Sequence, residues 1–349
     1  DGICRGAWIL GVSDEIYQIN ADSTILATGG GAGIFNDHLV GNEDVGDGYV
    51  LAHRAGEKLR NMEFIQFMLG LKQGTTRRFL PLSWLNKDAV LVDKWGRNLF
   101  NSTAWNKVDL DQVLTARKSH FPFSCRDVSG LVDVAVAAQH LKRKKVWWKD
   151  HSEKHTVSRE EIVHFAHAFN GGIRIDPSAE STVPGLFAAG EVATGPHGAD
   201  RIGGCMMTAT QVFGERAGRF AAQRARAFGR SKICGAAPPE YVARMEPKPG
   251  NTDNEISRKI ELAAREALSR FAGVLRSKEG LEKCHEKLDY LEQELEEVGS
   301  GNRIPFAEYL RLRNMILTGT LVTHAALERK ESLGSHFRMD FPPTNYPIQ

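Results

Sequence analysis

Several features that would mark a metal protein, a membrane protein or a nucleic-acid-binding protein are absent from this sequence. The 349 residues contain five cysteines, and none of them forms a C-x-x-C pair of the kind that binds zinc or an iron–sulfur cluster. No apolar run approaches the roughly 20 residues that span a bilayer. The net charge is only +2, which is too small to attract nucleic acid. We therefore expect no metal site, no membrane span and no nucleic-acid partner.

An initiating methionine and a signal peptide are also absent, since the sequence begins at Asp1. An odd number of widely spaced cysteines fits a reducing compartment. These features predict a cytoplasmic protein. They also leave open the hypothesis that the chain is a stable fragment of a longer polypeptide.

The composition itself is that of a soluble globular protein, with 42% hydrophobic and 25% charged residues, and its length suits two or three domains. Short apolar and alternating runs predict strands at 7–12, 15–20 and 23–27, and a helix is predicted up to Ala55. Residues 67–165 have a different pattern, with a strand at 89–93, a helix near 131–140 and a basic run that contains tryptophan. We interpret this stretch as an inserted domain.

The second half of the chain changes from strands to helices. Strands are predicted at 171–176 and 185–189, followed by a long helix at 206–228. The stretch 234–254 contains four prolines and reads as a linker. Apolar residues then recur at helical spacing, which predicts a small bundle of helices at about 254–275, 277–297 and 305–329.

Three glycine-containing motifs are candidates for a ligand site. Ala27-Thr28-Gly29-Gly30 follows a strand, which lets the backbone approach a cofactor closely. Gly185 to Glu191 forms a short buried strand that ends in Gly-Glu. His197 to Gly204 combines histidine and arginine, which suit a carboxylate, with glycines at a helix start that favours negative charge. Each motif alone also fits an ordinary strand end or capped helix.

Together these motifs resemble the succinate dehydrogenase/fumarate reductase flavoprotein family, which also contains L-aspartate oxidase. The family pattern G-L-[FY]-A-x-G-E followed by H-G-A-N-R-L-G-G-N-S-L is matched by GLFAAGE and HGADRIGGCMM. Further matches follow in order along nearly the whole chain: MEFIQF at 62–67, CRDVS at 125–129, AHAFNGGI at 166–173 and ESLGSHFRMDFP at 331–342.

The resemblance implies an α/β FAD-binding domain of Rossmann-like type, incomplete here, with an inserted α+β capping domain and a C-terminal helical bundle. The implied boundaries are 1–66 and 166–230 for the FAD-binding domain, 67–165 for the capping domain and 250–349 for the helical domain. The family's first segment, with its G-x-G-x-x-G turn, has no match in this sequence.

The resemblance also implies a chemistry, in which a hydride moves between FAD and a carbon next to a carboxylate. Arg126 matches the arginine that transfers the proton, and His167 and Arg201 match the clamp that holds the substrate carboxylate. His164 lies outside the motif, and we interpret His336 and Arg338 as interdomain contacts. The implied cofactor-binding residues are Ala27, Thr28, Gly29, Gly30, Asp47, Gly190, Glu191, Arg201, Gly204, Cys205, Met206 and Met207.

The sequence departs from the family at the second carboxylate site. The family has E-F-x-Q-x-H-P-T, whereas this chain has Met68, Leu69 and Gly70 at the last three positions. Met68 donates no hydrogen bond, and losing two donors to a buried carboxylate costs on the order of several kcal/mol. Thr75 to Arg78 are candidate replacements. We therefore expect a substrate with one carboxylate and an apolar arm as an alternative to fumarate or succinate.

Other departures and readings stay open at this stage. Cys205-Met206-Met207 replaces N-S-L, which makes the surroundings of the flavin ring less polar, and Asn170 replaces a methionine. The alternatives to an enzyme are a non-catalytic electron-transfer or flavin-binding subunit and a fragment without flavin. An L-aspartate oxidase is a further alternative. The family commonly works with an iron–sulfur partner, which implies an electron carrier and a place beside the inner membrane face.

Overall fold

The computed structural model describes residues 2–12, 15–85, 89–101, 108–150, 157–228, 254–301, 303–344 and 346. The predicted linker at 234–254 lies outside the described residues except for Asn254. Within the described residues, no helix combines the length and the apolar character needed to cross a membrane. The same part of the chain contains no group of three or more His, Cys, Asp or Glu side chains arranged to hold a metal ion.

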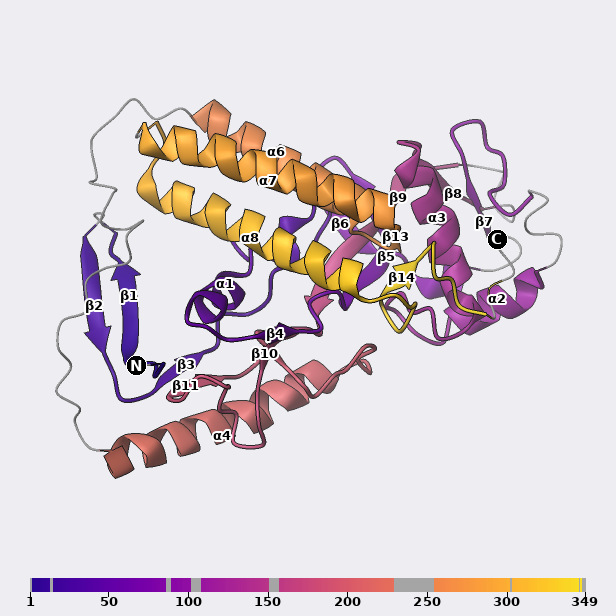
Figure 1. Ribbon diagram of the computed structural model, residues 1–349. Coiled ribbons are helices and arrows are strands. Elements are labelled where there is room, and N and C mark those ends of the chain that lie inside the picture. Colours follow the sequence, from indigo (N-terminus) through magenta and orange to yellow (C-terminus); the bar gives the residue numbers. More distant parts are fainter. Residues whose placement is uncertain are drawn as a thin grey trace.

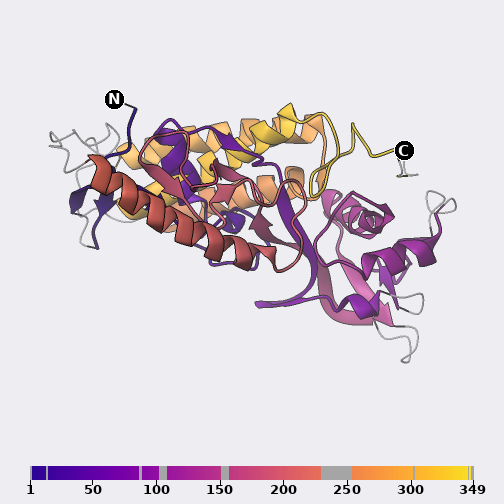
Figure 2. The same ribbon diagram turned by 90° about the horizontal axis from the view of Figure 1, so that it is seen from below.

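The first region contains short strands from two separate parts of the sequence, residues 6–60 and 172–194. The hairpin of β1 (Gly6–Leu10) and β2 (Ile16–Asn20) leads into β3 (Thr24–Leu26), which pairs in parallel with β11 (Leu186–Ala188). Helix α4 (Cys205–Phe228) packs against β3 and β11 on the side away from the other long helices (Figures 1 and 2). The remaining elements of this region are η1 (Ala32–Ile34), α1 (Asp47–Arg54), and a sheet of order β12-β10-β4, formed by Ala193–Thr194, Gly172–Arg174 and Leu59–Arg60.

A five-stranded antiparallel sheet forms the second region. Its central strands are β5 (Ile65–Gln73), with a run of seven buried residues, and the long β9 (Val157–Phe169). Buried apolar residues on successive positions are expected where both faces of a strand are covered. The sheet order is β6-β5-β9-β8-β7, and the outer strands and accompanying helices are β6 (Thr76–Phe79), β8 (Val146–Asp150), β7 (Ala89–Val92), η2 (Leu82–Trp84), α2 (Leu110–Arg117), η4 (Val128–Gly130) and α3 (Leu131–Leu141).

The third region is a bundle of α6 (Asn254–Phe271), α7 (Lys278–Ser300) and α8 (Phe306–Glu328), with β13 (Leu275–Arg276) paired to β14 (Phe337–Arg338). Along α7 the buried apolar residues recur every three or four positions, so one face turns to the bundle. Ser277 caps α7 by accepting a hydrogen bond from the Gly280 N–H at 3.1 Å. Gly319 of α8 sits against two neighbouring helices, because a Cβ there would lie 2.9 Å from Leu268.

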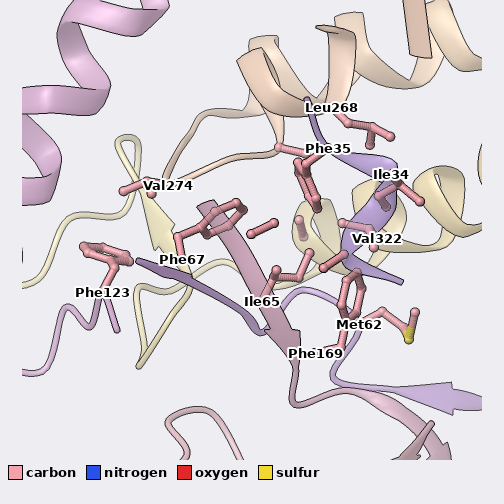
Figure 3. Packing of buried hydrophobic residues seen from close by; sticks show 14 of the residues in the cluster. Ile34, Phe35, Met62, Ile65, Phe67, Phe123, Phe169, Leu268, Val274 and Val322 are labelled. Atoms are coloured by element: carbon pink, nitrogen blue, oxygen red, sulfur yellow. The ribbon is translucent and has the colours of Figure 1, made fainter. Parts of the chain in front are cut away.

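One hydrophobic core connects the three regions. Figure 3 shows side chains of η1, β5, β9, α6 and α8 meeting in it. Phe35 and Phe67 meet edge to face, with 5.2 Å between their ring centroids. Helix α4 packs in a separate small cluster, with Ala217 and Ala221 against Phe187 and Ala189.

The predicted elements agree with the structure in type, and the errors lie at their ends. The helix predicted for 254–275 ends at Phe271, because residues 275–276 leave the helix to pair with β14. The strand predicted at 171–176 is the shorter β10. Strands β5 and β9 run across the predicted domain boundaries at 66/67 and 165/166 without interruption.

Candidate active site

Two parallel strands bring the first two motifs to one edge. Since β3 and β11 pair in register, Ala27–Gly30 and Ala189–Glu191 leave the sheet at the same end, and the Ala189 N–H donates to the Leu26 carbonyl at 3.0 Å. A Cβ on Gly30 would lie only 1.9 Å from Glu191 Oε1. A side chain at this position would therefore have to displace the Glu191 carboxylate.

Glu191 is held at this edge by the backbone of β9. Its Oε1 accepts a hydrogen bond from the Phe169 N–H at 2.8 Å, and its carbonyl accepts one from the Tyr49 hydroxyl at 3.2 Å. Burial raises the pKa of Glu191, while the Phe169 N–H and Arg201 act in the opposite direction. The carboxylate is thus fixed next to an open glycine turn, as a group that contacts a polar ligand would be.

The glycines and the start of α4 form an accessible backbone surface. Gly29 has φ +78°, and no described atom lies within 4 Å of an ideal Cβ built at Gly29, Gly203 or Gly204. Cys205 and Met207 are exposed, and Met206 is half-buried. Open backbone at a helix N-terminus favours an anionic or strongly polar group. These residues fit a flavin, whose ring and ribityl chain present such an edge.

The other predicted cofactor residues lie near this edge in different ways. Ala27 and Thr28 are exposed, and a Cβ on Gly48 would lie 2.0 Å from Thr28 Oγ1, so that turn packs closely against α1. Gly190 has φ +82° in the turn after β11. Asp47 instead accepts a hydrogen bond from Asn314 Nδ2 of α8 at 2.7 Å. Asp47 therefore links α1 to the helical bundle.

Arg201, a candidate site residue, is buried and held in place by Gln66. It is 8% exposed, its Nε donates to Gln66 Oε1 at 2.9 Å, and Gln66 Nε2 donates back to the Arg201 carbonyl at 3.2 Å. Within the described part of the chain, no hydrogen bond occupies its two terminal nitrogens. A guanidinium fixed through Nε with its fork left free is suited to a carboxylate ligand.

Two histidines lie in the field of Arg201. Burial lowers the pKa of His167, and the positive charge of Arg201 lowers it further. The same two causes, in the same order, lower the pKa of His197. Both imidazoles are therefore neutral at pH 7, so each can donate one hydrogen bond while Arg201 supplies the charge.

Arg126 meets the third motif across a loop-to-loop contact. Its Nη1 lies 3.6 Å from Asp200 Oδ2, and the Ser124 hydroxyl donates to the same oxygen at 2.7 Å. Asp127, on the other side, lies 3.4 Å from Arg126 Nε. The structure thus brings Arg126 to the residue that precedes Arg201, although about half of its side chain is exposed.

The end of the chain supports this loop contact from behind. The Cys125 N–H donates to the Gly334 carbonyl at 2.8 Å, and its thiol donates to the His336 carbonyl at 3.5 Å. Burial raises the pKa of Cys125 to about 12, so the thiol stays protonated and is a structural group. His336 Nδ1 lies 2.6 Å from Arg276 Nη1, and Arg338 donates to the Ala326 carbonyl of α8. His336 thus contacts other regions, through Cys125 and through the ring of Phe64, as interpreted, whereas the contacts found for Arg338 among the described residues stay within the helical region.

The second carboxylate site of the resemblance is apolar in this structure. Met68 and Leu69 are buried, and a Cβ on Gly70 would lie 1.9 Å from the ring of Phe165. The suggested replacements lie elsewhere, since β6 is exposed throughout and Arg78 pairs with Glu160. Among the described residues, no contact joins Thr75–Arg78 to Arg201 or Arg126. The polar donors missing from the sequence are therefore not restored by the fold.

Sequence reasoning missed three residues of the site: Gln66, Ser124 and Asp200. Gln66 is fully buried in a hydrophobic strand. In the sequence, an amide within an apolar run is the signal that could have identified it, because a buried amide needs hydrogen-bond partners. Asp200 stands where the family pattern has Asn, and this difference was also visible. The Ser124–Asp200 bond joins residues 76 positions apart, so only the structure reveals it.

Comparisons with known proteins agree with this geometry. The model of the FAD binding domain family matches residues 1–207, and that of the fumarate reductase flavoprotein C-terminal domain matches residues 262–345. The chain belongs to the succinate dehydrogenase/fumarate reductase flavoprotein family, whose cofactor is FAD. Its fold is the α/β flavoprotein fold with a helical C-terminal region.

Individual relatives are similar over nearly the whole chain. An uncharacterized FAD-dependent oxidoreductase of Methanocaldococcus jannaschii is 31% identical over 99% of this chain and 65% of its own length. A fumarate reductase (CoM/CoB) subunit of Methanothermobacter marburgensis is also 31% identical, over 99% of this chain and 66% of its own. L-aspartate oxidases are among the further matches. The chain therefore spans about two-thirds of the length of these two relatives.

A solved structure shares the fold. FrdA of the Escherichia coli quinol fumarate reductase superposes with a TM-score of 0.69 at 22% identity, covering 97% of this chain and 64% of FrdA. At this identity the likeness concerns the fold alone.

Proposed function

We propose that this chain is the greater part of an FAD-dependent oxidoreductase that interconverts an unsaturated and a saturated carboxylate. The observation that carries the proposal is Arg201, a buried guanidinium held by Gln66 with its terminal nitrogens left for a ligand. Its neighbours His167 and His197 are neutral donors, so the three side chains form a clamp for a single carboxylate. When bound, FAD supplies the hydride donor or acceptor.

The cofactor would be held by the edge described above. Backbone of Ala27–Gly30, Gly190 and Gly203–Gly204 and the carboxylate of Glu191 line it, with Cys205 to Met207 beside the ring. Arg201 belongs to both sites, since it lies in the field of Glu191 and at the start of α4. Asp47 is better assigned to the contact with Asn314. In the proposed division of the chain into 1–66 with 166–230, 67–165 and 250–349, the clamp residues belong to the first part and Arg126 to the second.

In the reducing direction, the substrate would take a hydride at the far carbon of its double bond and a proton from Arg126 at the carbon next to the carboxylate. Arginine is normally protonated, so Arg126 must regain that proton from a nearby group. Two carboxylates are close to it. Asp127 caps η4 through the Ser129 N–H at 2.9 Å, and although burial acts to raise its pKa, Ser129, His120 and Arg126 outweigh burial and lower it. Asp127 is therefore a poor proton carrier.

Asp200 is the better candidate for this relay. It is only partly buried, it faces Arg126, and the Ser124 hydroxyl fixes one of its oxygens. We assign Asp200 the role of returning a proton from solvent to Arg126 during reduction and of removing it during oxidation. It acts through Arg126, and is thus a positioning and relay residue.

The substrate class follows from the apolar strand. Met68, Leu69 and Gly70 provide no donor for a second carboxylate, and Phe165 fills the space beside Gly70. We propose a monocarboxylate whose other end is apolar, such as a 2-alkenoate, in preference to fumarate or L-aspartate. A non-catalytic flavin-binding subunit is the second candidate, because an apolar strand without donors also suits a protein that has lost its substrate site.

The test uses the full-length protein, reduced with dithionite without oxygen, while acids are added and the visible spectrum of the flavin is followed. Crotonate and cinnamate are compared with fumarate at equal concentration. We expect reoxidation by a 2-alkenoate at least about tenfold faster than by fumarate. Faster reoxidation by fumarate would overturn the substrate class, and a flavin that stays reduced with all acids would favour the non-catalytic subunit.

Electrons must also reach or leave the cofactor. We propose an iron–sulfur protein or a similar electron carrier as the partner, because the named relatives include fumarate reductase subunits. A cytoplasmic location, with the partner at the inner membrane face, fits this arrangement. Co-purification of the tagged full-length protein with an iron-containing subunit would test it.

A further inference from the structure

A pocket apart from the clamp lies where the five-stranded sheet region meets the helical bundle. Its volume is about 300 Å³, and its walls are the C-terminal end of α3, strand β9, the residues after η1, and the C-terminal end of α6. It shares no lining residue with the clamp of His167, His197 and Arg201. A volume of this size holds a small organic molecule.

The inner wall of this pocket is apolar. Phe35 and Phe67 form its base, and Val163, Leu141 and Val274 complete it. Figure 3 shows Phe35, Phe67 and Val274 among the buried cluster, so the base belongs to the rigid core. The wall therefore favours a ligand with an apolar body.

The rim carries more cations than its own acids can neutralise. Arg143 pairs with Glu266 at 3.4 Å, and Lys145 pairs with Glu161 at 2.8 Å. The remaining lining acid, Asp37, accepts from Lys72 at 2.6 Å. Lys144 and Arg270 also line the pocket, and among the described residues neither has a carboxylate within 4.0 Å.

Three buried nitrogens of pocket-lining residues have no hydrogen-bond partner in the described part of the chain: Nε of Arg270, Nε2 of His140 and Nε2 of His164. Of these atoms, Nε of Arg270 always carries a proton, and a buried N–H without an acceptor costs free energy, so an acceptor for it is expected from outside the chain. Burial and then His164 lower the pKa of His140 to about 4, so its imidazole is neutral at pH 7. His164 Nε2 lies 3.3 Å from Asp133 Oδ1, so its nearest polar neighbour is a residue of the protein itself.

We propose that this pocket binds a small organic anion, a carboxylate or phosphate attached to an apolar body. The apolar body lies on Phe35 and Phe67, and the anionic group lies at the rim, where Lys144 and Arg270 provide charge and Arg270 Nε donates. The ligand touches α3 and α6 at once and so joins the two regions. This assignment does not depend on the reaction proposed above.

The experiment uses the full-length protein and 4-fluorobenzoate, whose fluorine resonance broadens on binding. The neutral analogue 4-fluorobenzyl alcohol tests the need for charge. Arg201→Gln removes the carboxylate clamp, which separates binding in the pocket from binding in the active site. The double variant Lys144→Gln/Arg270→Gln removes the two unpaired cations, and Lys142→Gln/Arg258→Gln is the matched control, since both residues are exposed and line no part of the pocket.

We expect the Arg201→Gln protein and the control double variant to retain 4-fluorobenzoate binding in the pocket. The Lys144→Gln/Arg270→Gln variant, measured in the Arg201→Gln background, should bind at least about tenfold more weakly, and so should the alcohol to the unmodified pocket. If the double variant does not fold, Lys144→Gln alone is measured, because Lys144 is exposed and the fold does not depend on it. Loss of this one cation should weaken binding about threefold.

Equal binding of the alcohol and the benzoate would overturn the anionic class of ligand. Unchanged binding by the cation variants, or loss of all benzoate binding in Arg201→Gln, would overturn the site itself. These outcomes do not involve turnover, so they are distinct from a failure of the proposed reaction.

Discussion

Two buried arginines in this molecule differ in how many of their donors the protein itself satisfies. Arg117 is fully buried, and all three of its nitrogens donate: Nε to Asp133 at 2.7 Å, Nη2 to Asp133 and to the Phe121 carbonyl, and Nη1 to the His120 carbonyl. Arg201 is nearly as buried, but only its Nε is engaged, by Gln66. Burial alone therefore does not mark a functional arginine.

This difference distinguishes a structural arginine from a candidate ligand-binding arginine in this fold. A buried charge must be neutralised and hydrogen-bonded, or the fold is destabilised. Arg117 meets this need with Asp133 and holds the loop that carries Arg126. Arg201 meets it only in part, which is the arrangement expected when the remaining partner is a ligand. The two residues should therefore respond differently to substitution.

Removing the terminal nitrogens of the Arg201 guanidinium should have the largest effect on activity. We expect Arg201→Gln to lower kcat/KM with the best alkenoate by about 100- to 1,000-fold, because a preorganised donor to developing charge is lost. Stability should change little, since Gln66 keeps a polar partner. Steady-state rates and thermal unfolding measured on the same preparation check both points; a large drop in Tm would contradict the comparison.

Breaking the Arg117–Asp133 pair should have the largest effect on stability. Asp133→Asn leaves Arg117 with an uncompensated buried charge, which is expected to cost about 3–5 kcal/mol. Urea unfolding monitored by circular dichroism measures this loss, and Asp111→Asn on the exposed side of α2 is the control. If Asp133→Asn folds as stably as the parent, Arg117 is not the structural counterpart described here.

The same pair predicts a pH dependence at the acid end. Burial alone would raise the pKa of Asp133, but Arg117 and His164 outweigh it and lower the pKa below its ordinary value of 3.8. A carboxyl with a lowered folded pKa adds stability above its unfolded pKa and loses it as the pH falls through the folded value. The acid unfolding transition should therefore move to higher pH in Asp133→Asn.

Asp200 should affect the rate of proton return more than substrate binding. We expect Asp200→Asn to lower kcat about tenfold and to flatten its pH profile, while KM changes little. Ser124→Ala, which loosens Asp200 without removing its charge, should retain most of the rate. A change confined to KM would indicate that Asp200 only closes the loop over the substrate.

A polar residue on the apolar strand should shift the substrate preference. We expect Met68→His to improve the ratio of fumarate to crotonate turnover by about tenfold, through a donor to the second carboxylate. Met68→Leu keeps the volume and should leave the ratio unchanged. An unchanged ratio in Met68→His would place the second substrate group elsewhere.

Much of this account could be predicted from sequence, for physical reasons that vary by residue. The motif around Arg201 could be predicted because glycines and a helix start need fixed spacing. Helix α7 could be predicted because its apolar residues recur at the helical period. The Arg126–Asp200–Ser124 contact was not readable, since it joins loops that are far apart in the chain. The pocket between α3, β9 and α6 could not be predicted either, because its excess of positive charge depends on which lining acids are already paired.

The central claim is that Arg201 leaves its terminal nitrogens for one substrate carboxylate. The most direct measurement titrates crotonate and crotonamide into the oxidised full-length protein and into Arg201→Gln, and follows the visible spectrum of the flavin. The account predicts that crotonate binds at least about tenfold more tightly than crotonamide in the parent and that the two bind alike in Arg201→Gln. Equal binding of the two ligands to the parent protein would contradict it.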